Sequence, residues 1–89
     1  MPNQQYDPQV YHKNHETHFV YARVYLPNEG PERQFDAEIV AAYDDHCVVR
    51  SGAVEQPIRE FTIPASCVCY IYVGASKAAC EAWRRRWSA

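Results

Sequence analysis

The sequence predicts a mainly β fold, a small five-stranded barrel with a short helix before it and a second helix after it. The chain has 89 residues, which is enough for one hydrophobic core but too few for two. From residue 19 to residue 73, apolar residues recur at every second position between turn-forming residues, as in half-buried strands. After residue 76 they follow a helical repeat instead. We therefore expect a single domain over residues 1–89, with an N-terminal arm and helix (1–18), the barrel (19–73) and a C-terminal helix (74–89).

The first helix is predicted from Asp7 and Pro8. An aspartate can accept hydrogen bonds from the free amides of a first helical turn, and proline fits that turn because it lacks an N–H. We expect this helix to span residues 8–14. The helices at the two ends of the chain can each cover an open mouth of the barrel.

Five strands are predicted, at residues 19–26, 33–43, 46–50, 54–62 and 67–73. In the first turn, residues 27–31, Gly30 is free to adopt a positive φ. Pro57 indicates that the fourth strand lies at an edge or contains a bulge, because proline cannot donate a ladder hydrogen bond. Residues 64–66 are expected to form one tight helical turn. Closure into an SH3-like or OB-like barrel is favoured over a sandwich because it removes exposed strand edges.

Composition and motifs exclude several classes of function. The formal charge is −2, whereas proteins that bind duplex DNA mainly through its phosphates usually have a strongly basic surface. With three glycines and no nucleophile signature, the chain lacks the motifs of phosphate-binding loops and hydrolases, so we expect neither enzyme activity nor a cofactor. We find no apolar stretch of membrane-spanning length and no secretion signal, and therefore expect a cytoplasmic protein that does not bind membranes.

The charge is divided unevenly between the body and the C-terminal helix. Residues 1–76 carry five basic and ten acidic side chains, and residues 77–89 carry four basic and one acidic. Ser76 is the expected N-cap of the helix. Two interpretations of its basic, aromatic end remain open: the tryptophans pack on the barrel while the arginines face solvent, or this end is a binding patch for RNA or an acidic protein surface. The patch would comprise Trp83, Arg84, Arg85, Arg86 and Trp87.

The four cysteines are expected to be reduced core residues, because the chain carries no export signal. The alternative is a metal site. Cys67 and Cys69 would point to one face of a strand and supply half of such a site, with two more ligands from Cys47, Cys80 or His46. No CxxC pair supports this alternative, and we predict no metal.

Several short motifs resemble the Sm-like family, and within it the Hfq-like RNA chaperones. The resemblance spans residues 7–72. It rests on Asp7-Pro8 at the start of the first helix, Tyr25-Leu26 with Asn28 and Gly30 at the first turn, Tyr43-Asp44 at the end of the second strand, Gln56 in the fourth strand, and Ile58 and Ile63 around the start of the fifth. It implies an N-terminal helix on a strongly bent five-stranded sheet. It also implies a ring of copies, in which the fourth strand of one copy pairs with the fifth strand of the next.

The fifth strand is apolar on both faces, so we expect it to be covered on both sides. Either a neighbouring copy in such a ring or the C-terminal helix of the same chain would provide the cover.

The resemblance also implies binding of single-stranded, purine-rich RNA at Tyr25, Asn28, Gly30 and Gln56. A tyrosine ring can stack on a base, a glutamine amide can pair with the edge of adenine, and glycine allows close approach of the backbone. The family's uridine site is not expected here, because Arg59-Glu60-Phe61 replaces its Tyr-Lys-His run and His46 replaces its phenylalanine. The family's bend-forming glycine is also missing from the second strand, where Ala37 aligns.

Two hypotheses of function follow. The first is a non-enzymatic, oligomeric Sm-like regulator that binds single-stranded purine-rich RNA. The second is a protein-interaction module or inhibitor of the same barrel class, which would bind a nucleic-acid-handling protein through its acidic body.

Overall fold

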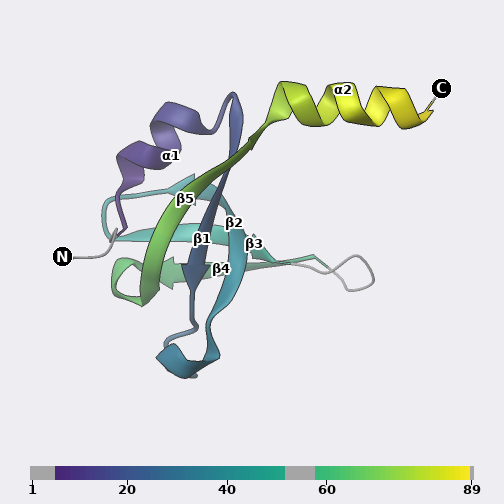
Figure 1. Ribbon diagram of the computed structural model, residues 1–89. Helices are drawn as coiled ribbons and strands as arrows, with labels where there is room; N and C mark the ends of the chain where they lie inside the picture. Colours follow the sequence, from purple (N-terminus) through teal and green to yellow (C-terminus); the bar gives the residue numbers. More distant parts are fainter. Residues whose placement is uncertain (1–5, 52–57, 89) are drawn as a thin grey trace.

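The protein folds as one antiparallel sheet with a helix at each end (Figure 1). The computed structural model describes the backbone of residues 6–51 and 58–88, and the side chains of residues 6–51 and 58–82. The elements in chain order are α1 (Pro8–Asn14), β1 (His18–Val24), the 3-10 turn η1 (Pro31–Arg33), β2 (Phe35–Ala42), β3 (His46–Ser51), β4 (Arg59–Pro64), the 3-10 turn η2 (Ala65–Cys67), β5 (Val68–Ser76) and α2 (Lys77–Ser88).

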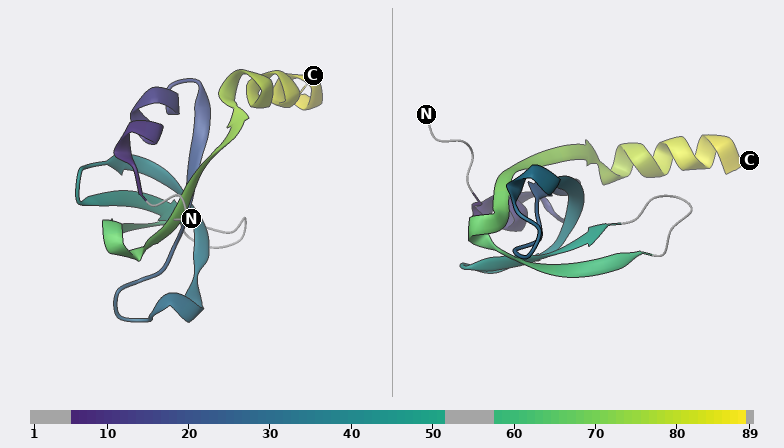
Figure 2. Two further views of the ribbon diagram at one scale, coloured as in Figure 1. Left: turned by 60° about the vertical axis from the view of Figure 1, so that its left-hand side comes forward. Right: turned by 90° about the horizontal axis from the view of Figure 1, so that it is seen from below.

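The strand order is β4-β3-β2-β1-β5, which makes β4 and β5 the two edges of the sheet. The five-stranded, mainly β prediction is therefore confirmed. The predicted closure is wrong: in the part of the chain that the structure describes, β4 and β5 form no ladder with each other. The sheet instead curls around its core and leaves both edge strands with one open side (Figure 2).

Bulges allow this curl without a glycine in β2. The β2–β3 register shifts between Ile39 and Ala41, and the β1–β5 register shifts between Arg23 and Val24. An extra residue in one strand bends that strand and increases its twist. The alanine at position 37 therefore does not prevent a strongly bent sheet.

The core lies on the concave face, where every second residue of β1 points inward. α1 packs against β1, β2 and β5 beside this core. The buried residues are Val20, Ala22, Val24, Ala37, Ile39, Ala42, Cys47, Val49, Ile63, Cys67, Val68 and Ile71.

Local signals fix both helices. The carboxylate of Asp7 accepts a hydrogen bond from the amide of Gln9 at 2.9 Å, and α1 spans the predicted residues. The hydroxyl of Ser76 accepts one from the amide of Ala79 at 3.0 Å, which confirms it as the cap of α2. No helix in the described part of the chain is long and apolar enough to cross a membrane.

α2 does not cover a mouth of the barrel, contrary to expectation. It extends from the end of β5 in a direction away from the sheet (Figures 1 and 2). The side chains of Ala78, Ala79, Glu81 and Ala82 are exposed. The outer face of β5 is therefore not covered by the C-terminal helix.

Candidate nucleic-acid interface

The turn after β1 brings together three of the predicted RNA-binding residues. The amides of Glu29 and Gly30 both donate to the carbonyl of Leu26, at 3.0 and 3.3 Å. Gly30 has a φ of 89°, in the left-handed region that glycine adopts without strain. This conformation confirms the predicted turn and places Asn28 at its exposed tip.

Tyr25 is held in place by η2, the turn that joins β4 to β5. Its amide donates to the carbonyl of Cys67 at 3.1 Å, and its hydroxyl donates to the carbonyl of Ser66 at 3.2 Å. Partial burial and the neighbouring Cys67 raise the pKa of the hydroxyl, which therefore remains a neutral donor. The half-buried ring is thus positioned before any ligand arrives, which lowers the entropic cost of stacking a base on it.

Acidic groups surround the same turn. Glu29 and Glu32 are exposed, and a Cβ built on Gly30 would lie 3.0 Å from Oε1 of Glu32. The guanidinium group of Arg33, which is exposed at the end of η1, carries a positive charge beside this turn. With two carboxylates and one guanidinium, this turn is locally acidic.

The remaining predicted residues are not brought into this turn. Gln56 lies outside the described residues. α2 includes the residues of the predicted basic and aromatic patch, Trp83, Arg84, Arg85, Arg86 and Trp87. Their side chains lie outside the described part of the structure. Because Ser76 pairs with His18 while Val68 pairs with Val24, α2 begins at the end of β1 opposite Tyr25. The two predicted sites therefore lie at opposite ends of the β1–β5 pair.

Between them lies a set of aromatic residues that the sequence analysis did not identify as a site. We define the tyrosine strip as Tyr21 of β1 with Tyr70 and Tyr72 of β5. The rings of Tyr21 and Tyr72 stack with centroids 5.5 Å apart, and those of Tyr70 and Tyr72 lie 5.9 Å apart. The alternation of Tyr21, Arg23 and Tyr25 on one face of the first strand was the signal that could have revealed it.

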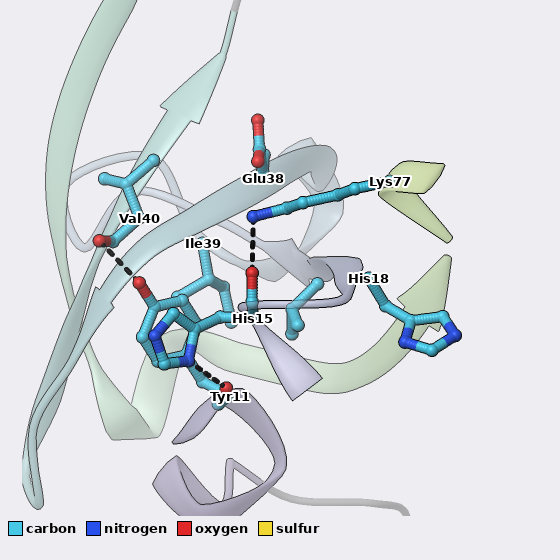
Figure 3. Close-up of a pocket in the computed structure, with 8 residues that line it drawn as sticks. Tyr11, His15, His18, Glu38, Ile39, Val40 and Lys77 are labelled. Carbon is cyan, nitrogen blue, oxygen red and sulfur yellow. Dashed lines mark hydrogen bonds between the residues drawn. The ribbon is translucent and has the colours of Figure 1, made fainter. Parts of the chain in front are cut away.

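A cavity of about 150 Å³ forms where α1, β2 and α2 meet (Figure 3). Tyr11 stacks on His15 with centroids 4.5 Å apart and donates to the carbonyl of Val40 at 2.9 Å. The ammonium of Lys77 donates to the carbonyl of His15, and Glu38 lines the same space. Tyr11, His15 and Lys77 all form hydrogen bonds with other groups of this chain. These bonds hold α1, β2 and α2 together around the cavity.

The cysteines divide into two pairs. Cys47 and Cys67 are buried in the core, as predicted, whereas Cys69 and Cys80 are only half-buried. Burial raises the pKa of Cys47 to about 11. All four are free thiols, and within the described residues no three His, Cys, Asp or Glu side chains lie together as metal ligands would.

No family model, no curated protein and no solved structure matches this chain.

Proposed function

We propose that this protein is a non-enzymatic, Sm-like regulator that binds single-stranded, purine-rich RNA through the turn after β1. The observation that carries the proposal is the fixed position of Tyr25, which two hydrogen bonds tie to η2 in the same turn as Asn28 and Gly30. A base that stacks on a preset ring gains about 1–3 kcal/mol of binding free energy. Asn28 and the backbone at Gly30 can then donate to and accept from the edge of the purine.

The edge strands support assembly into a homo-oligomer. The resemblance to the Sm-like family implies pairing of the fourth strand of one copy with the fifth of the next, and β4 and β5 are the two edges of this sheet. Open edges expose backbone donors and acceptors, which a neighbouring copy would satisfy. On this proposal closure occurs between chains, which is consistent with the absence of a β4–β5 ladder among the described residues of one chain.

The acidic body determines how RNA would bind. Ten acidic side chains against five basic ones before residue 77 disfavour a surface coated with phosphates. Recognition would depend on the bases, with Arg84, Arg85 and Arg86 of α2 as the main basic cluster. We therefore expect the affinity for oligo(A) to fall as the salt concentration rises. The slope of log affinity against log salt should be small, because it should correspond to only a few phosphate contacts.

The test is a fluorescence anisotropy titration of labelled oligo(A) at several salt concentrations, combined with light scattering of the free protein. Tyr25→Ala should weaken binding about 5- to 150-fold, which corresponds to one lost stacking contact. Tyr43→Ala is the matched control, because Tyr43 is 51% exposed and its ring stacks on His46 instead. A monomeric mass would contradict the ring, and unchanged affinity in Tyr25→Ala would contradict this binding site.

The second candidate is a protein-interaction module that binds a nucleic-acid-handling protein. Two observations favour it: the acidic turn with Glu29 and Glu32, and the uncovered tyrosines of β5. Tyrosine is enriched at the centres of protein interfaces. Capture of one protein partner together with no binding of oligo(A) would favour this function over the first.

A further inference from the structure

The outer face of β1 and β5 carries a continuous row of rings. Tyr21 lies opposite Tyr72 and Arg23 lies opposite Tyr70 in the antiparallel register. The planes of Tyr21 and Tyr72 differ by 25°, and those of Tyr70 and Tyr72 by 42°. The three rings therefore form one aromatic surface that spans two strands.

This surface is open to solvent. Tyr70 is 41% exposed and Tyr72 is 38% exposed, although their rings contact each other. β5 has a neighbour on one side only, and α2 leads away from this face (Figures 1 and 2). Contiguous exposed apolar surface is a feature of binding sites.

The position of the strip links the two ends of the proposed interface. Side chains alternate along a strand, so Arg23, Tyr21 and Phe19 follow one another on the outer face of β1 at about 6.8 Å per pair of residues. Tyr25 comes just after this strand, beyond a register shift, and its half-buried ring packs against the core. At the far end, the ammonium of Lys77 lies 5.7 Å from the centroid of the Phe19 ring, at the first residue of α2. The row thus leads from the turn that holds Tyr25 to the helix that carries three arginines.

We propose that the tyrosine strip is a stacking platform for bases of single-stranded RNA, and that the RNA runs along β1 and β5 from the Tyr25 turn towards α2. This inference rests on the proposed function and adds a second contact region to it. Exposed aromatic residues on a sheet bind successive bases in this way because every base presents a π face.

The charges beside the strip determine which part of the RNA can face it. Arg23 donates to Asp36 and to Gln34, each at 3.1 Å, so its charge is largely compensated. Glu38 lies opposite Tyr21 on the side of β2. A phosphate would be repelled on that side, so the bases face the rings and the RNA backbone lies on the β5 side of the strip, where no acidic residue occurs between Val68 and Ser76.

The test measures oligo(A) affinity of Tyr70→Thr and Tyr72→Thr, because threonine preserves the tendency to form a strand but removes the ring. Each variant should bind about 5-fold more weakly or worse, while Tyr72→Phe, which keeps the ring, should bind as the wild type does. Tyr43→Thr is the exposed control. Photo-crosslinking of oligo(A) that contains 8-azidoadenosine should label the peptide with Tyr70 and Tyr72, as identified by mass spectrometry.

The outcomes separate this inference from the proposed function. Weaker binding in Tyr70→Thr and Tyr72→Thr, together with the crosslink, supports the platform. Full affinity in both variants, with binding still lost in Tyr25→Ala, overturns the platform and leaves the proposed function intact; a strip that serves a protein partner would give this result. A wild-type protein that binds no RNA overturns both.

Discussion

The ring of Tyr21 lies so close to Gly74 that a Cβ at residue 74 would be 2.6 Å from its Cε2 atom. Gly74 belongs to the edge strand β5, and the ring of Tyr21 on β1 covers the place where a side chain is missing. Tyr21 in turn stacks on Tyr72. The orientation of the tyrosine strip therefore depends on the absence of a side chain at position 74. An aromatic ring that packs over a glycine in this way also stabilises an edge strand.

Gly74→Ala should destabilise the protein, although alanine is normally the better strand residue by about 0.5–1 kcal/mol. The φ of Gly74 is not positive, so the backbone itself would accept alanine. The added methyl group must displace the ring of Tyr21, and overpacking of this kind costs about 1–3 kcal/mol. Chemical denaturation followed by circular dichroism measures the change.

The control removes the ring. In a Tyr21→Ser background the same Gly74→Ala change should cost nothing or should stabilise the protein, since the methyl group then meets no aromatic atom. An equal loss of stability in both backgrounds would show that the contact between Tyr21 and residue 74 is not responsible.

Two isoleucines near β4 should respond very differently to truncation. Ile63 is fully buried in the core, whereas Ile58, directly before β4, is 68% exposed. Ile63→Ala should lower the free energy of unfolding by about 2–5 kcal/mol, because the cavity it leaves adds to the lost burial. Ile58→Ala should change it by less than about 0.5 kcal/mol. Similar effects at both positions would contradict the described packing of β4.

The elements that the sequence predicted well depend on local signals. Asp7 caps α1, Gly30 takes the positive φ of the first turn, and Ser76 caps α2, each through contacts within a few residues. The sequence predicts that the fifth strand ends at Val73, because the apolar repeat changes from that of a strand to that of a helix at residues 74–76. β5 continues to Ser76 because Tyr21 of a different strand covers Gly74, and no local pattern contains that information.

The candidate site was predicted only in part for the same reason. Tyr25, Asn28 and Gly30 are close in sequence and share one turn. The second apolar face of β5 was expected to be covered, but whether it is covered depends on the direction that α2 takes after Lys77. Closure of the sheet also depends on contacts between β4 and β5, which alternation within each strand does not specify.

Thiol alkylation should distinguish the two pairs of cysteines. Iodoacetamide should label half-buried Cys69 and Cys80 in the folded protein and should reach Cys47 and Cys67 only after unfolding, because those two lie in the core. Burial also raises the pKa of Cys47 to about 11, so little reactive thiolate forms there near neutral pH. Mass spectrometry of peptides from native and denatured samples gives the labelling of each residue. Labelling of Cys47 at the rate of Cys80 in the folded protein would contradict the packing of β3.

The stability of the protein should fall steeply between about pH 10 and about pH 12, and Tyr6 is a main cause. Its single hydroxyl proton is shared between the carbonyls of Tyr43 and His46, and burial raises its pKa from 10.0 to about 12. In the unfolded chain the hydroxyl ionises near its ordinary value, so the stabilisation is complete below about pH 10 and is lost as the pH rises towards 12. Buried Cys47 extends the same trend down to about pH 9, because its pKa rises from 9.0 to about 11.

Tyr6→Phe isolates the contribution of the hydroxyl. The variant loses the hydrogen bond that the hydroxyl shares between two carbonyls and should be less stable than the wild type at neutral pH, by about 1–3 kcal/mol. Above about pH 10 its stability should decline less than that of the wild type, because it has no hydroxyl that ionises more readily in the unfolded state. Urea denaturation at a series of alkaline pH values measures both effects. Parallel curves for the two proteins would mean that Tyr6 titrates alike in the folded and unfolded states and that its hydroxyl is not buried against β3.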